Sequence, residues 1–114
     1  MSELHFYTAD TLVHLERYPE AEAHYFAELR DFPQQTRARV GLATLYQATE
    51  RPEDAGRVLT DMTRLTPTPE SYAQAARLWK ALGNPRQADA VRAEARRAFP
   101  SRAEPARGPR ARAR

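Results

Sequence analysis

Apolar residues recur at helical spacing through the middle of the chain. In residues 35–51 they follow the three- and four-residue steps of a helix and not the alternation of a strand. Residues 52–67 show the same steps, begin with Pro52 at a position suited to a first helical turn and stop at Pro67. The apolar positions are Val40, Leu42, Ala43, Leu45, Tyr46, Ala48, Ala55, Val58, Leu59, Met62 and Leu65. The pattern predicts two antiparallel helices that form a hairpin.

The same unit occurs three times along the chain. Alanine, alanine and proline recur in steps of 12 residues, and successive units advance by 34 and then 33 residues. The nine positions are Ala9, Ala21, Pro33, Ala43, Ala55, Pro67, Ala76, Ala88 and Pro100. A second proline series, Pro19, Pro52 and Pro85, opens the second helix of each unit, and Asn84 is a good N-cap for the last. We therefore predict three helical hairpins.

The paired alanines predict a close crossing of the two helices in each hairpin. A small side chain on both helices lets the backbones approach, and a bulky residue three positions after the first alanine fills the space beside the contact. The bulky residues are Leu12, Tyr46 and Trp79.

This spacing resembles the tetratricopeptide repeat, a 34-residue helix-turn-helix unit, over residues 2–100. In the second repeat the family positions are held by Leu42, Ala43, Tyr46, Ala55, Leu59, Met62 and Pro67, and Arg39 departs from the pattern. The resemblance implies an all-α fold: a right-handed α-solenoid of three antiparallel hairpins. We expect one domain over residues 1–100, with repeats at about 2–33, 34–67 and 68–100.

Two departures from the family pattern carry expectations of their own. Arg92 stands where the family prefers an aromatic residue that faces the next hairpin, which predicts that the last helix closes the stack. Phe26 and Leu29 lie beside the family positions of the first repeat, which predicts a slightly rotated second helix there.

The resemblance also implies a concave groove, lined by the first helix of each hairpin, that binds a peptide or protein segment. Carried over by position, the groove residues are Glu3, Phe6, Asp10, Val13, Arg37, Val40, Thr44, Gln47, Glu70, Ala73, Arg77 and Lys80. Arg37, Arg77 and Lys80 can pair with an acidic segment, or they are ordinary solvated charges. The resemblance implies a non-catalytic interaction module that acts as a scaffold, an assembly factor or a chaperone-like adaptor.

The carboxylate clamp of chaperone-binding members is not expected in this chain. Those members carry Lys and Asn where this sequence has Phe6 and Asp10. Asp10 would repel a ligand carboxylate, so we expect no binding of an EEVD-type C-terminal peptide.

Three interpretations of the apolar residues Phe6, Tyr7 and Val13 remain open. They form a docking patch, they are covered by earlier repeats of a longer array, or they pack within the first hairpin. The first interpretation includes a weak homodimer through the first hairpin, as an alternative to a monomer.

The positive charge of the chain is concentrated at its end. Residues 101–114 hold five arginines and one glutamate, while the whole chain of 114 residues has a formal charge of +3, so residues 1–100 sum to −1. This Arg-, Ala- and Pro-rich tail predicts disorder. Weak binding of nucleic acid or an anionic surface through the tail is the alternative function.

The sequence offers little that supports catalysis. It has no cysteine, no glycine-rich phosphate loop and no nucleophile motif. Glu20, His24 and Glu28 share one helix face and can hold a cation only weakly, so we expect no metal, no cofactor and no enzyme. No apolar run reaches the length of a membrane span and no export signal stands at the N-terminus, which leads us to expect a cytoplasmic protein.

Overall fold

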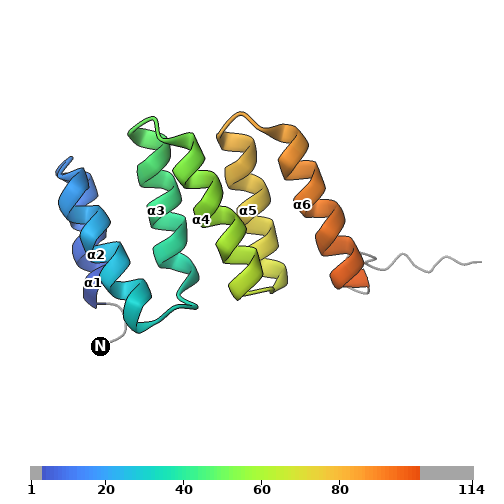
Figure 1. Ribbon diagram of the computed structural model, residues 1–114, viewed down its shortest axis with the longest axis horizontal. Helices are drawn as coiled ribbons and strands as arrows, with labels where there is room; N and C mark the ends of the chain where they lie inside the picture. The colour runs from blue at the N-terminus through green and yellow to red at the C-terminus, as the bar shows by residue number, and fades with distance from the viewer. Residues whose placement is uncertain (1–3, 101–114) are drawn as a thin grey trace, which may run out of the picture.

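The computed structural model describes residues 4–100, and this part of the chain contains six α-helices and no strand (Figure 1). The helices are α1 (Leu4–His14), α2 (Tyr18–Asp31), α3 (Thr36–Ala48), α4 (Pro52–Leu65), α5 (Pro69–Ala81) and α6 (Pro85–Ala98). The expected all-α stack of helical hairpins is confirmed. The tail predicted to be disordered, residues 101–114, lies outside the described residues.

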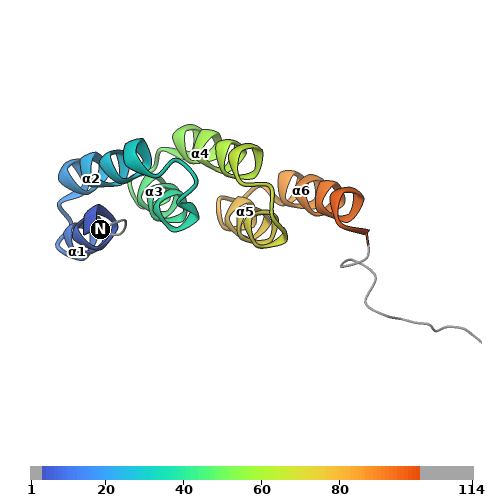
Figure 2. The same cartoon turned by 90° about the horizontal axis from the view of Figure 1, so that it is seen from below.

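The six helices form two layers that bend into an arch. Each helix contacts the next along the chain, and α3 also contacts α1 and α5. Among the described residues, α2 and α4 do not contact each other, and neither do α4 and α6. Figure 2 shows α1, α3 and α5 on the inner side of the arch and α2, α4 and α6 on the outer side. The first helix of each hairpin therefore lies on the concave side.

Each hairpin turns through one residue in the left-handed backbone region. Glu16 and Glu50 both have φ 59° and Gly83 has φ 83°, and these positions are separated by the 34- and 33-residue steps of the repeat. The helix after the third turn, α6, is capped by Asn84, whose side chain accepts a hydrogen bond from the Gln87 backbone N–H at 3.1 Å. The structure thus confirms the N-cap predicted at Asn84.

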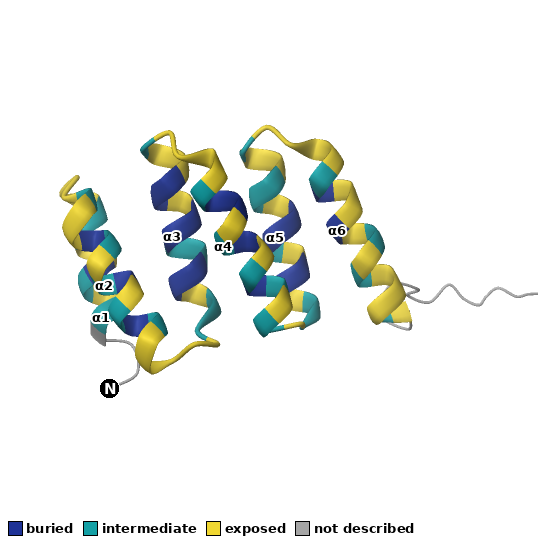
Figure 3. Ribbon diagram, viewed as in Figure 1, coloured by how far each residue is buried: buried dark blue, intermediate teal, exposed yellow. Residues whose placement is uncertain are grey.

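The paired alanines are buried at the helix crossings, as predicted. Ala9, Ala21, Ala55 and Ala88 have no exposed surface, and Ala43 and Ala76 are at most 2% exposed. Figure 3 shows the buried positions gathered on α3, α4 and α5, whereas α6 is mostly exposed. The core consists of two clusters, one shared by the first two hairpins and one by the last two, and Val58 and Leu82 pack against both.

The second helix of the first hairpin, α2, buries the residues at the family positions and is not rotated away from them, contrary to the expectation from Phe26 and Leu29. Tyr25 and Glu28 occupy the buried family positions, while Phe26 is 50% exposed. The physical reason is a close approach: a Cβ atom at Gly41 would lie 2.5 Å from the Tyr25 ring, so this glycine makes the room that Tyr25 fills. The phase of α2 is set by that contact and not by its most apolar residues.

The two junctions between neighbouring hairpins are built from different side chains. Between the first and second, the Tyr46 hydroxyl donates to Glu22 at 2.6 Å, and the Arg51 guanidinium donates to the same carboxylate at 3.2 Å. Between the second and third, the Trp79 ring packs on Gly56, where a Cβ atom would lie 2.8 Å from the ring. Both junctions thus place an aromatic ring against a glycine, and the first adds a polar contact through Glu22.

Arg39, which departs from the family pattern, is buried at the start of α3. It is 8% exposed and its guanidinium donates to the Pro33 carbonyl in the loop before the helix. Burial lowers the pKa of the Arg39 guanidinium, and the charge of Asp61 opposes that shift. Arg92, by contrast, is exposed and pairs with Asp89 at 3.3 Å.

Candidate functional site on the concave face

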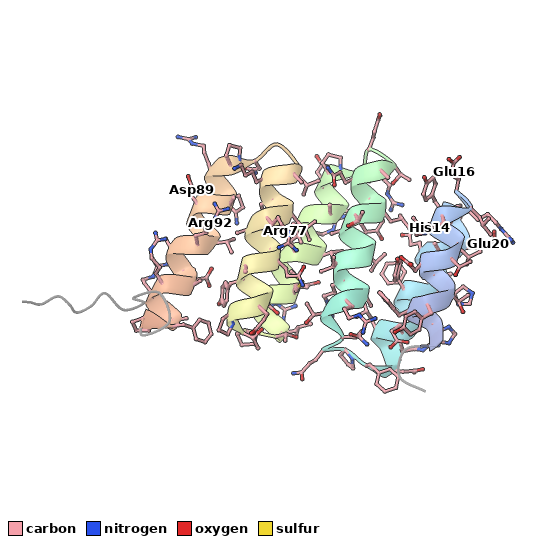
Figure 4. All side chains as sticks on the ribbon, turned by 180° about the vertical axis from the view of Figure 1, so that it is seen from behind. His14, Glu16, Glu20, Arg77, Asp89 and Arg92 are labelled. Carbon is pink, nitrogen blue, oxygen red and sulfur yellow. The ribbon has the colours of Figure 1, made fainter. Side chains whose placement is uncertain are left out.

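The predicted groove residues lie on α1, α3 and α5, the inner helices of the arch (Figure 2). Figure 4 looks at the molecule from behind the view of Figure 1 and places Arg77 on α5. The side chains of Asp10, Arg37, Thr44, Gln47, Ala73, Arg77 and Lys80 are exposed, and those of Phe6, Val13 and Val40 are half-buried. Glu3 lies outside the described residues. We call this set of inner-helix residues the concave face.

The apolar part of the concave face is anchored in the core. Phe6 and Val13 pack against the core of the first two hairpins, and Val40 packs against the core of the last two. Of the three interpretations of the first hairpin, packing within the core therefore holds for Phe6 and Val13. Tyr7 differs from them because it is 54% exposed.

Arg37 is held between α1 and α3 by aromatic contacts. Its guanidinium carbon lies 4.6 Å from the centre of the Phe6 ring and 5.6 Å from that of Tyr7, and it donates to the Tyr7 hydroxyl at 3.1 Å. The repeat spacing predicts Phe6 and Arg37 in the groove but not Tyr7. The contact joins residues 30 positions apart, so only the packing of the two helices reveals it.

The polar part of the concave face spans α3 and α5. The Gln47 side-chain amide donates to the Ala81 carbonyl at 3.0 Å and so links the ends of the two helices. The Arg77 guanidinium donates to the Gln74 amide oxygen at 2.8 Å, which is a neutral partner. Thr44 donates to the Val40 carbonyl of its own helix at 2.9 Å. Between described residues, no contact joins Asp10 to Arg77 or to Lys80.

The two layers of the arch differ in charge. The exposed charges of the inner helices are three cations and two carboxylates, since Arg39 is buried, whereas the outer helices carry seven cations and nine carboxylates. The ion pairs between described residues lie on the outer helices or in the turns before them, as in Arg51–Asp54 at 2.8 Å and Arg64–Asp61 at 2.8 Å. Arg77 and Lys80 take part in none of these pairs. The inner side therefore attracts negatively charged groups.

The predicted row of Glu20, His24 and Glu28 is not assembled as a site. Glu20 binds Arg17 at 2.6 and 2.7 Å, and this bond lowers the pKa of the Glu20 carboxyl. His24 instead faces His5, with 2.9 Å between their Nδ1 atoms. Within residues 4–100 there is no group of three or more His, Cys, Asp or Glu placed to hold a metal ion.

Glu28 is a buried carboxylate that the sequence pattern does not explain. It is 1% exposed and fills the position that Met62 holds in the second hairpin. The Gln35 side chain donates to Glu28 Oε2 at 3.4 Å, and Oε1 has no hydrogen-bond partner. Glu28 therefore belongs to the packing of the first hairpin and not to a cation site.

None of the helices in the described part of the chain has the length and apolar character needed to cross a bilayer.

A stack of helical hairpins with a charged concave face is the arrangement of an α-solenoid that binds proteins. A family model described as tetratricopeptide repeat matches residues 12–78, which is more than half of the chain. The chain belongs to the tetratricopeptide repeat family. Members of this family are generally protein–protein interaction modules and are typically non-catalytic. Searches of curated proteins and of solved structures gave no match.

Proposed function

We propose that this chain is a non-catalytic interaction module whose concave face holds a segment of a partner protein. The observation that carries the proposal is the positive charge of Arg77 and Lys80 on the inner side of the arch, which no ion pair between described residues neutralises. A module of this kind serves as a scaffold, an assembly factor or an adaptor. We assign it to residues 1–100, with repeats at about 2–33, 34–67 and 68–100.

The concave face offers a partner three kinds of contact. Phe6, Val13 and Val40 present apolar surface over the core, and Tyr7 and Arg37 form an aromatic and cationic pair beside it. Arg77 and Lys80 provide two cations on the third hairpin. Because guanidinium groups hold carboxylates through paired hydrogen bonds, the Arg77 end favours acidic side chains of the partner.

The test uses a random peptide library displayed on phage and selected against the full chain, followed by affinity measurement with the best synthetic peptide. The double variant Arg77→Glu with Lys80→Glu should weaken that peptide at least about tenfold, because two attractive charges become repulsive. The matched control is Arg86→Glu with Arg97→Glu, which makes the same change in net charge on exposed positions of α6. The control should leave the affinity within about twofold.

Two results contradict the proposal. The library enriches no peptide, or the α6 control loses as much affinity as the concave-face variant. Circular dichroism of each variant shows whether the helices are retained, so that loss of binding is not read from an unfolded chain.

A further inference from the structure

The third hairpin has an open groove at its outer end. Residues of α5 and α6 enclose about 550 Å³ there. The lining combines small, aromatic and charged side chains, among them Glu70, Tyr72, Ala76, Arg92, Arg96 and Phe99. The Tyr72 and Phe99 rings meet edge to face, with 5.9 Å between their centres. We call this surface the end groove.

The end groove is the place that a following hairpin would occupy. Thirty-three residues earlier, the second hairpin has Ala43, Leu59 and Met62 where the third has Ala76, Arg92 and Ala95. Ala43, Leu59 and Met62 are buried in one cluster with Tyr72 and Ala76 of α5. The same surface of the third hairpin therefore accepts the first helix of another hairpin, with arginines in place of part of the apolar contact.

The first hairpin presents a matching helix face. In the second junction, Trp79 of α5 lies against Gly56 of α4, and Leu82, directly after α5, lines a groove with residues of α4. Their counterparts 67 residues earlier are Leu12 and Leu15 of the first hairpin. Leu15 is 58% exposed, so the residue that corresponds to a junction leucine is uncovered by the described elements.

The two ends of the stack also differ in charge. Besides the buried Glu28 and Glu22 at the first junction, the first hairpin, residues 4–31, holds four carboxylates and two arginines. The third, residues 69–98, holds six cations and three carboxylates. Opposite charge at the two ends favours their association and disfavours contact between two like ends.

We propose that the end groove receives α1 of a second copy of this chain in a head-to-tail contact. Leu12 and Leu15 face α6 of the neighbour, and Arg92 and Arg96 face the acidic first hairpin. The chain's own residues 101–114 are a poor occupant, because their five arginines would meet two more. The contact joins two different surfaces, so it can continue from copy to copy and does not stop at a dimer. It does not depend on peptide binding by the concave face.

Sedimentation velocity of the full chain tests this contact. The weight-average mass should rise with concentration at about 50 mM salt and fall back toward the monomer at about 500 mM salt, because the attraction is screened. Arg96→Glu and Leu15→Lys should each lower the association constant at least tenfold. Arg97→Glu and Phe26→Lys are the controls, since Arg97 lies outside the end groove and Phe26 is an equally exposed apolar residue of the first hairpin.

Mixing the two disruptive variants identifies the kind of contact. The Leu15→Lys chain keeps its end groove and the Arg96→Glu chain keeps its α1 face, so an equimolar mixture should form a dimer that grows no further. A symmetric dimer through the first hairpin would instead survive Arg96→Glu and be lost with Leu15→Lys. That result, or a wild-type chain that stays monomeric at about millimolar concentration and low salt, overturns the proposal.

Discussion

The residues that turn each hairpin share one conformation but not one chemistry. Glu16, Glu50 and Gly83 all have positive φ, and only glycine adopts this region without a steric penalty. For other residues the left-handed conformation costs roughly 1 to 2 kcal/mol. The first two turns therefore carry a backbone penalty that the third does not.

Substitution at these turns should change stability in opposite directions. Glu50→Gly should raise the free energy of unfolding by about 0.5 to 1 kcal/mol, because relief of strain exceeds the added entropy of the unfolded chain. Gly83→Ala should lower the free energy of unfolding by about 1 kcal/mol. The loss comes from backbone strain, because no atom lies within 4 Å of the added Cβ. Urea unfolding measures both. Glu53→Gly, in the first turn of α4, is the control and should destabilise the chain. A higher free energy of unfolding in that variant would contradict relief of backbone strain as the cause at Glu50.

Two tyrosine hydroxyls make the fold sensitive to alkali. Burial, with a smaller effect of the Asp10 charge, raises the pKa of Tyr25 to about 12. Burial and the bond to Glu22 raise the pKa of Tyr46 above its usual range. Since both folded pKa values exceed the unfolded value near 10, their stabilisation is complete below about pH 10 and is lost as the pH rises through the folded values.

Tyr46→Phe should therefore flatten the alkaline loss of stability. At pH 7 the variant loses the hydrogen bond to Glu22, at a cost of about 1 kcal/mol. Thermal unfolding between about pH 8 and about pH 11 measures the slope, which should be smaller than in the wild-type chain. Tyr18→Phe is the control because the Tyr18 side chain is also partly buried; an equal flattening in that variant would contradict the role of Tyr46.

At the scale of the helix, two glycines set the spacing between neighbouring hairpins. Gly41 lies against the Tyr25 ring, which is 2% exposed and has no free space to move into. Gly56 lies against the edge of the Trp79 ring, which is half-buried beside an open groove. The same added methyl group therefore meets a fixed ring in one helix and a movable ring in the other.

Gly41→Ala and Gly56→Ala should have different effects on the free energy of unfolding. Alanine gains up to about 1 kcal/mol over glycine in a helix, and overpacking a fixed core costs about 1 to 3 kcal/mol. We expect Gly41→Ala to destabilise the chain by about 1 to 2 kcal/mol and Gly56→Ala to be neutral or stabilising. Chemical unfolding of the two variants side by side checks this, and equal losses would show that Trp79 is as fixed as Tyr25.

The helices could be predicted from the sequence because each is marked by spacing and by its ends. Alanines at 12-residue steps located the crossings, and Asn84 located an N-cap. The phase of α2 was predicted wrongly because Phe26 is more apolar than Glu28, whereas the structure buries Glu28 and exposes Phe26. A single helix pattern does not contain the contact with Gly41 that fixes this phase.

At the scale of the whole molecule, the helices differ in how many neighbours hold them. The third helix contacts α1, α2, α4 and α5, whereas α5 is the one described helix that α6 contacts. In a linear stack, local opening begins where a helix has the fewest neighbours. Native-state hydrogen exchange should thus be slowest in α3 and faster in α6, by at least about tenfold. Uniform exchange over all six helices would instead show that the stack opens only as one unit.

The candidate site could be predicted only in part. The repeat spacing placed Arg37, Thr44 and Arg77 on inner helices, and their exposure agrees with that placement. It could not supply the contact of Tyr7 with Arg37, or the hydrogen bond of Arg77 to the neutral Gln74. Both depend on which side chains meet in space, and a repeat pattern describes only backbone positions.

The unlike junctions restrict how this array can evolve. A gene duplication that copied the middle hairpin would set Tyr46 against Gly56, although Tyr46 is fitted to Glu22 and Gly56 to Trp79. The new junction would have neither the carboxylate that the tyrosine needs nor the indole that the glycine admits. A copied unit would therefore leave the Tyr46 hydroxyl without its carboxylate acceptor, so a stable added hairpin calls for a compensating change at position 46 or 56.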